Sequence, residues 1–348
     1  MHRRRWVIVV AVLSLGGLSA PMASAQAPAA APTASSNATG WYLALGDSLA
    51  AGYQPGQGDD KTGGYVGGVL GAVKAETAKT KLVNVACSGE TVVTMVRGGR
   101  CAYDEGTQLA QALEFLHAHS RTTRLVTIDI GANDVQRCVS RSPLGIDFAC
   151  IQQGLGDVQR LLPQVLARLH AAAPEAHIIV ANYYNPFLAA YLTGAAGQAL
   201  AQQSVALQTA LNTIIAGSAA SVGADVADVA TAFRSTDFTP VNVPSLGGVV
   251  PANVATICAL TWMCQLGDIH ANDAGYAVMT RPSRPDSEPR SSGTGTRRDT
   301  TSPGPALGWN PCALRGSRRA TTRHTVWSTG RARRSPRSRG TRSTCGSS

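Results

Sequence analysis

The sequence predicts an α/β domain in which a parallel β-sheet is covered on both faces by helices. Short apolar segments bounded by Gly, Asn or Pro alternate along the chain with longer segments of helical periodicity. This alternation is typical of parallel sheets wrapped by helices. The interval 41–280, about 240 residues, is long enough for one domain with a complete core.

Five apolar runs are predicted to be strands: 41–45, 82–86, 124–130, 177–184 and 224–229. Four longer segments are predicted to be helices: 65–78, 107–119, 151–172 and 196–220. The third helix carries an apolar stripe that we assign to the core. Pro163 lies inside that stripe and removes a backbone donor, which leaves a kinked and a continuous helix as alternatives.

Residues 1–25 have the features of a signal peptide. Three arginines (3–5) precede a short apolar run, and Ala23-Ser24-Ala25 is a small-residue cleavage site. The run is shorter than the ~20 residues that span a bilayer, so a retained anchor is the less favoured alternative. Residues 26–40 are rich in Ala, Pro, Ser and Thr and are predicted to be a flexible leader. We expect a secreted, monomeric protein without stable membrane insertion.

Residues 281–348 differ in composition from the rest of the chain. They carry 15 Arg, no Lys and three acidic residues, and they are predicted to be a disordered basic tail. One hypothesis is a frameshift near codon 280, and the alternative is a natural tail that binds polyanions or cell wall. Residues 27–280 hold 13 basic and 18 acidic residues, so the domain offers no basic face and we expect no nucleic-acid partner.

Six of the eight cysteines lie in the predicted domain. Disulfides are expected in an exported chain, and six cysteines allow 15 connectivities. Sequential pairing is favoured because each pair brackets a short loop next to a motif. A metal site is disfavoured, since the ligand spacings Cys-x-x-Cys and His-x-x-x-His do not occur. The favoured pairs are Cys87–Cys101, Cys138–Cys150 and Cys258–Cys264.

Candidate reactive groups follow the first three predicted strands, where parallel sheets bind ligands. Ser48 follows the first strand, Gly89 the second and Asn133 the third. The Ser48 and Gly89 N–H groups and the Asn133 amide would place three donors around one point, as a tetrahedral oxyanion requires. Taken singly, each residue is also explained as an ordinary turn residue.

A serine nucleophile needs a base that removes its proton. His270 lies in LGDIHANDAGY, just ahead of a helix opened by Asn272 and Asp273, and Asp268 precedes it by two residues. A carboxylate at this place can fix the imidazole tautomer and stabilise its cation. The other histidines lie in the signal peptide, in the tail, near helix ends or at a strand start.

Together, GDSLAAGY, the glycine of ACSGET, GANDV and DIHANDAGY resemble the four sequence blocks of the SGNH/GDSL hydrolases, in order across 41–280. The paired cysteines resemble the secreted actinobacterial members. The resemblance implies a flavodoxin-like three-layer α/β/α fold with a five-stranded parallel sheet of order 2-1-3-4-5. It also implies ester hydrolysis through an acyl-enzyme, without cofactor or metal. Its roles would be Ser48 as nucleophile, His270 as base, Asp268 as its orienting acid, and Ser48, Gly89 and Asn133 as oxyanion donors.

One feature departs from the family pattern. The usual spacing is Asp-x-x-His, which would place the acid at Gly267, whereas this chain has Asp-x-His. Either Asp268 reaches the ring from its shifted position, or a backbone carbonyl near Gly267 orients His270. The first interpretation is favoured.

Two apolar segments, 183–192 and 238–264, are expected to border the active-site crevice. Their composition favours an esterase or lipase that acts on lipid-like acyl esters. A carbohydrate O-acetyl esterase is the alternative if loop aromatics stack on a sugar. A catalytically impaired secreted binding protein is the alternative if the closing helix has been lost.

Overall fold

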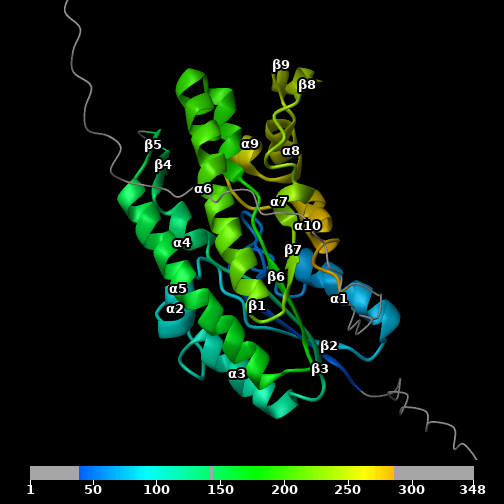
Figure 1. Ribbon diagram of the computed structural model, residues 1–348. Helices are drawn as coiled ribbons and strands as arrows, with labels where there is room; N and C mark the ends of the chain where they lie inside the picture. Colours follow the sequence, from blue (N-terminus) through cyan, green and yellow to red (C-terminus); the bar gives the residue numbers. More distant parts are fainter. Residues whose placement is uncertain (1–38, 142–143, 286–348) are drawn as a thin grey trace, which may run out of the picture. The chain divides into compact units, whose positions relative to one another are not determined.

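The computed structural model describes residues 39–141 and 144–285 (Figure 1). The predicted signal peptide, residues 26–38 of the predicted leader and residues 286–348 of the predicted tail lie outside the described residues. These three assignments and the domain boundaries therefore stay predictions.

The predicted parallel sheet is confirmed. Its five strands have the order β2-β1-β3-β6-β7, which is 2-1-3-4-5 when only the strands of this sheet are counted, and all its neighbouring pairs are parallel. Every strand starts within a residue of its predicted position. The strands are β1 (Trp41–Gly46), β2 (Lys81–Asn84), β3 (Thr123–Asp129), β6 (His177–Ala181) and β7 (Asp225–Ala227).

The four long helices and the short closing helix also occur where the sequence predicts them. They are α1 (Gly64–Glu76), α3 (Gln108–His119), α5 (Phe148–Ala172), α6 (Ala195–Ala220) and α10 (Asp273–Thr280). Helix α5 is continuous across Pro163, which settles the choice between a kink and an unbroken element. Its predicted apolar stripe packs into the core.

Short elements that were not predicted from the sequence connect the strands and the long helices. The short helices are α2 (Val92–Arg97), α4 (Ala132–Gln136), α7 (Val229–Ala232), α8 (Ala252–Leu260), α9 (Met263–Leu266) and the 3₁₀ segments η1 (Pro186–Thr193) and η2 (Pro244–Leu246). Two antiparallel hairpins are formed by β4 (Val139–Arg141) with β5 (Leu144–Ile146) and by β8 (Pro240–Val243) with β9 (Gly248–Pro251).

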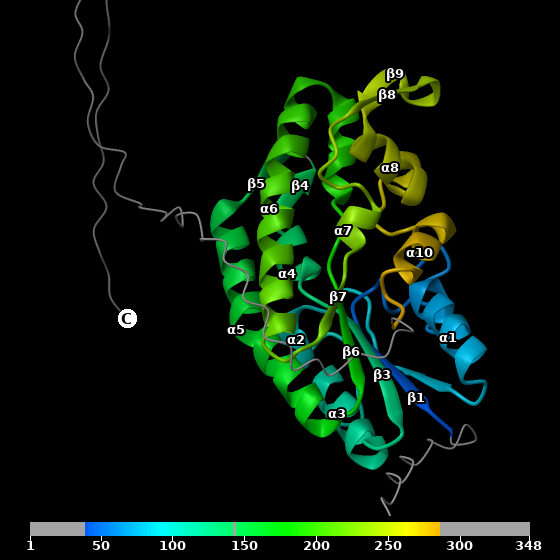
Figure 2. The ribbon, with the colours of Figure 1, turned by 45° about the vertical axis from the view of Figure 1, so that its right-hand side comes forward.

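The sheet lies between two layers of helices (Figures 1 and 2). Helices α1 and α10 cover one face, and α2, α3, α5 and α6 cover the other. The central strands β1 and β3 are almost entirely buried, as expected when both faces of a parallel sheet are covered. Their carboxyl ends are in register at Gly46 and Asp129, where the chain turns into the functional loops.

The closing helix α10 packs against α1. A Cβ on Gly68 of α1 would lie 2.3 Å from the Thr280 hydroxyl oxygen, so the glycine permits this close approach. The Tyr276 hydroxyl donates to the Tyr53 carbonyl at 2.9 Å and ties α10 to the loop after β1. Met279 and Ser283 are buried, so the ordered packing continues past the end of the helix.

All three predicted disulfides are present. Cys87–Cys101 joins the segment after β2 to the loop before α3, Cys138–Cys150 joins the end of α4 to α5, and Cys258–Cys264 joins α8 to α9. Within residues 39–141 and 144–285, none of the helices has the length and apolar character needed to cross a bilayer.

Candidate active site

Ser48 lies in the turn that follows β1, and most of its surface is buried. The turn begins at Gly46, whose φ of +137° is accessible to glycine and strained for other residues. A Cβ at Gly46 would also lie 2.4 Å from the Asp129 carbonyl oxygen on β3. Glycine at 46 therefore lets two neighbouring strand ends meet directly beneath Ser48.

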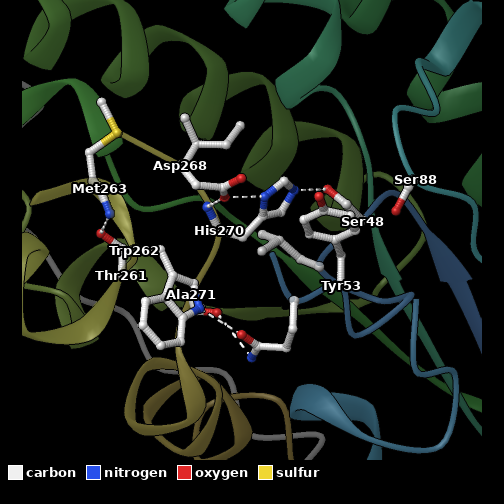
Figure 3. Close-up of polar contacts among 12 residues, drawn as sticks. Ser48, Tyr53, Ser88, Thr261, Trp262, Met263, Asp268, His270 and Ala271 are labelled. Atoms are coloured by element: carbon white, nitrogen blue, oxygen red, sulfur yellow. Dashed lines mark hydrogen bonds and ion pairs between the residues drawn. The ribbon is translucent and has the colours of Figure 1, made fainter. Parts of the chain in front are cut away.

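His270 reaches Ser48 from the loop between α9 and α10 (Figure 3). Its Nε2 lies 2.8 Å from Ser48 Oγ, and its Nδ1 lies 2.6 Å from Asp268 Oδ1. The Tyr53 ring packs beside the imidazole with 4.3 Å between centroids. The backbone of the loop is held as well, because the His270 carbonyl accepts from Trp262 N at 3.0 Å.

The short spacing between Asp268 and His270 is accommodated by a local turn. Asp268 Oδ1 accepts the backbone N–H of His270 at 2.9 Å and also contacts its Nδ1. One carboxylate oxygen thus binds both groups of the same residue, a geometry that a two-residue spacing allows. This contact agrees with the favoured interpretation, in which Asp268 itself contacts the ring.

Asn133, at the start of α4, lines the same cavity as Ser48 and His270. One N–H of its amide donates to the Glu90 carbonyl at 2.9 Å. The amide has a second N–H, which can bind another acceptor. Asn133 therefore supports two functions, anchoring the 89–91 loop and offering a donor to the cavity.

Gly89 has the backbone conformation expected of an essential glycine. Its φ is +80°, and a Cβ there would lie 2.4–2.6 Å from the Arg100 guanidinium. Arg100 Nε in turn donates to the Ser88 carbonyl at 2.8 Å. Among the described residues that line the Ser48 cavity, however, Gly89 does not occur. Gly89 belongs to the loop that Asn133 anchors, one residue before the Glu90 carbonyl that accepts from the Asn133 amide.

Two cavities adjoin at the site. The Ser48 cavity has an empty volume of about 290 Å³, open space included, and is lined by Asp47, Ser48, Leu49, Ala132, Asn133, Gln136, Tyr183, Tyr184, Ile269 and His270. The second, which we call the apolar cavity, has about 440 Å³ and shares Ala132, Gln136, Tyr183 and Tyr184 with the first.

The apolar cavity extends between α4, α5, α6 and the start of η1. Its other lining residues are Val135, Val139, Ile151, Asn185, Pro186, Phe187, Ser204, Leu207, Gln208 and Leu211. Three of its polar side chains are hydrogen-bonded within the protein, since Asn185 Nδ2 donates to Ser204 Oγ and Gln208 Nε2 donates to the Tyr183 carbonyl. The predicted segment 183–192 thus borders the crevice, whereas 238–264 contributes none of the lining residues of either cavity.

Buried acids surround the site, and the sequence analysis did not assign them a role. Asp134 on α4 accepts the N–H of Val92, the first residue of α2, at 2.9 Å. Burial raises its pKa to about 7, and the Val92 hydrogen bond and the Arg137 charge oppose this shift. Asp47 and Asp129 are buried beneath Ser48. In the sequence, Asp47 and Asp129 could have been recognised as acidic residues at the ends of two buried strands that lie side by side.

No group of three or more His, Cys, Asp or Glu side chains within the described part of the chain is arranged to hold a metal ion. A serine hydrogen-bonded to a histidine, which contacts a carboxylate, can form a covalent acyl intermediate.

A parallel α/β/α domain with this serine, histidine and aspartate at the strand ends has the architecture of a serine hydrolase. The model of the GDSL-like lipase/acylhydrolase family matches residues 44–278. The chain belongs to this family, and it is a hydrolase that acts on carboxylic ester bonds.

Solved structures of lipases and esterases are similar to this chain. The extracellular lipase from Streptomyces rimosus is 25% identical, with 64% of this chain and 100% of that chain covered and a TM-score of 0.40. The lipase Lip_vut3 from a goat rumen metagenome is 17% identical, with 70% and 95% covered and a TM-score of 0.44. An acetyl-xylooligosaccharide esterase from Geobacillus is 20% identical, with 70% and 91% covered and a TM-score of 0.41. No curated protein matches the chain.

Proposed function

We propose that the protein is a secreted esterase or lipase that hydrolyses lipid-like acyl esters through an acyl-enzyme on Ser48. The observation that carries this proposal is the 2.8 Å contact between Ser48 Oγ and His270 Nε2 in the Ser48 cavity, which adjoins the apolar cavity. In the first step His270 removes the hydroxyl proton as Ser48 Oγ attacks the ester carbonyl carbon. Asp268 holds the ring and stabilises the imidazolium that forms.

The tetrahedral intermediate needs donors for its oxyanion. The Ser48 N–H and the free N–H of the Asn133 amide are the proposed donors, with the Gly89 N–H as a third. Collapse of the intermediate breaks the bond to the alcohol, which takes the proton from His270. Water then attacks the acyl-enzyme with His270 again as base, and it releases the acid and free Ser48.

The proposed substrate class follows from the apolar cavity. Its walls are mostly apolar, and the Asn185, Ser204 and Gln208 side chains among them are hydrogen-bonded within the protein, which suits an acyl chain. An acetyl group would leave this space unfilled, so the cavity favours longer acyl chains over sugar O-acetyl groups.

Covalent labelling tests the nucleophile. A fluorophosphonate should label Ser48, and peptide mass spectrometry should locate the adduct there. Ser48→Ala should abolish labelling, whereas Ser88→Ala, a matched serine after β2, should retain it. An unlabelled folded wild-type protein would reject the enzyme mechanism and favour the binding-protein alternative.

A chain-length series tests the substrate class. p-Nitrophenyl esters of increasing acyl length should be cleaved with rising kcat/KM, in preference to acetylated xylan. Leu207→Trp should fill the apolar cavity and lower kcat/KM for long acyl esters by at least tenfold. It should leave kcat/KM for the acetate ester near that of the wild type. Leu192→Trp, on the exposed end of η1, is the matched control. A strong preference for acetylated xylan would instead identify a carbohydrate esterase.

Export is proposed from the predicted signal peptide and the three disulfides. The full chain should be expressed in a secreting host. N-terminal sequencing of the protein recovered from the culture medium should then show a mature chain that begins at Gln26. Retention of the full-length chain in the cells would contradict this proposal.

A further inference from the structure

Two carboxyl groups are buried directly beneath the nucleophile. Asp47 is 2% exposed and Asp129 is 0% exposed. They lie at the carboxyl ends of the paired strands β1 and β3, where the Asp47 N–H donates to the Asp129 carbonyl at 3.1 Å. Neither carboxyl forms an ion pair with a Lys, Arg or His in the part of the chain that the structure describes. The hydrogen bonds that the two carboxyls accept therefore come from neutral donors.

The donors differ between the two carboxyls. Asp47 accepts the Leu49 N–H at 3.0 Å and the Tyr183 hydroxyl at 2.7 Å. Asp129 accepts the Tyr65 hydroxyl at 2.5 Å and the Asp47 N–H at 3.3 Å. Asp47 also lines the Ser48 cavity together with His270, whereas Asp129 does not line it. Only Asp47 therefore faces the proposed reaction centre.

Two buried negative charges this close together are costly, because neither can be solvated. Burial raises the pKa of both groups. The charge of Asp47 raises the pKa of Asp129 further, to well above its ordinary range. For Asp47, hydrogen bonds from Asp129, Leu49 and Tyr183 and the charge of His270 oppose the effect of burial. Asp47 shares the Ser48 cavity with His270, whereas Asp129 accepts from the neutral Tyr65 hydroxyl, so this placement favours the proton of the pair on Asp129.

The other titratable groups around the pair are neutral phenols or belong to the Ser48 site. Burial raises the pKa of the five phenols well above neutrality. Asp268 contacts His270 from the opposite ring nitrogen. His270 is therefore the one group facing Asp47 that gains a positive charge during the proposed reaction. The phenols are Tyr42, Tyr65, Tyr183, Tyr184 and Tyr276.

We propose that Asp129 keeps a proton and that Asp47 is a buried anion which stabilises the His270 imidazolium and fixes the Ser48 turn. Asp47 is then a second positioning residue for the base, in addition to Asp268. This inference rests on the proposed serine mechanism. Asp129 acts on the reaction only through Asp47, as the neutral partner that allows a single charge in this buried place.

Matched isosteric variants separate the two acids. Asp129→Asn mimics a protonated carboxyl and should retain kcat/KM within about threefold of wild type, with an unchanged pH profile. Asp47→Asn removes the anion and should lower kcat/KM about tenfold, the equivalent of one pKa unit. The acid limb of its kcat/KM profile should move to lower pH, because the imidazolium is less stable. KM should change little, and the control is Asp157→Asn on α5, whose carboxylate pairs with Arg160.

A measurement without turnover keeps the inference testable if a variant folds poorly. Infrared difference spectra at pH 8 between wild type and Asp129→Asn should show the loss of a buried protonated carboxyl band. NMR of the imidazole should report a lower His270 pKa in Asp47→Asn. Equal losses in both variants, or an unmoved acid limb in Asp47→Asn, would overturn the inference. Wild-type labelling by the fluorophosphonate distinguishes these results from failure of the serine mechanism itself.

Discussion

At the residue scale, the contact between Asp268 and His270 shows what sequence spacing can and cannot decide. The family spacing would place the acid at position 267, which is a glycine here, and the aspartate stands one residue later, at Asp268. The loop conformation decides which group contacts His270 Nδ1. Asp268 Oδ1 fixes that conformation, because it binds both the backbone N and the Nδ1 of His270. That double contact is a tertiary detail of a few ångströms, and no periodicity in the sequence encodes it.

Removal of this carboxylate should therefore be costly. We expect Asp268→Ala to lower kcat by about 10⁴-fold, because the imidazole loses both its tautomer and the partner of its cation. Steady-state kinetics on a p-nitrophenyl ester measure this loss. Asp273→Ala, which removes a carboxylate that accepts from Gln54 Nε2 at 3.3 Å, should stay near wild type. A loss of less than tenfold in Asp268→Ala would mean that a backbone carbonyl orients the ring.

Comparison of Gly89 with Gly106 tests how much the close contact between Gly89 and Arg100 contributes to stability. Their φ angles are +80° and +79°, so alanine at either position costs about 1–2 kcal/mol in the left-handed region. At Gly106 a Cβ would meet nothing within 4 Å, whereas at Gly89 it would displace the Arg100 guanidinium. We expect Gly89→Ala to lower the free energy of unfolding in urea more than Gly106→Ala does, and to lower kcat as well. Equal losses in both variants would show that the Arg100 contact contributes nothing.

At the element scale, the long elements could be predicted and the short ones could not. Strands such as β3 and helices such as α5 carry enough apolar positions for their period to be recognised. The strands of the hairpins β4–β5 and β8–β9 and the helices α4 and α9 hold three to five residues each, too few to show a period. The Ser48 site depends on both kinds, since β1 presents Ser48 and short α4 presents Asn133.

Helix α4 also makes the stability depend on pH through Asp134. Burial raises its pKa to about 7 from an ordinary 3.8, so the folded protein holds a proton there that the unfolded chain releases. The stability from this group is present below about pH 4 and is lost as the pH rises through 7. Asp134→Asn should flatten this dependence while keeping the acceptor for Val92 N–H. Urea unfolding at pH 5 and pH 8 measures the effect, and an equal pH dependence in the variant and wild type would contradict it.

At the scale of the whole molecule, the site is assembled from residues more than 200 positions apart in the chain. Parallel strands bring Ser48 and Asn133 to one end of the sheet, and the loop before α10 returns His270 to them. The sequence predicted these positions because each follows a recognisable strand or precedes a capped helix. It did not predict the apolar cavity, since that space depends on how α4, α5 and α6 pack.

The contacts that hold the site lie within residues 39–285, which leads to a prediction about truncation. The compact unit that contains the site ends at Pro289. A chain that stops after Pro289 keeps Tyr276, Met279 and Ser283 in their buried places, so it should retain the Tm and kcat/KM of the full chain. A chain that stops after Asn272 removes α10 and exposes the face of α1, and it should fail to fold or lose most of its activity. Calorimetry and ester hydrolysis on both truncations test this, and a large loss in the longer one would show that residues 290–348 support the fold.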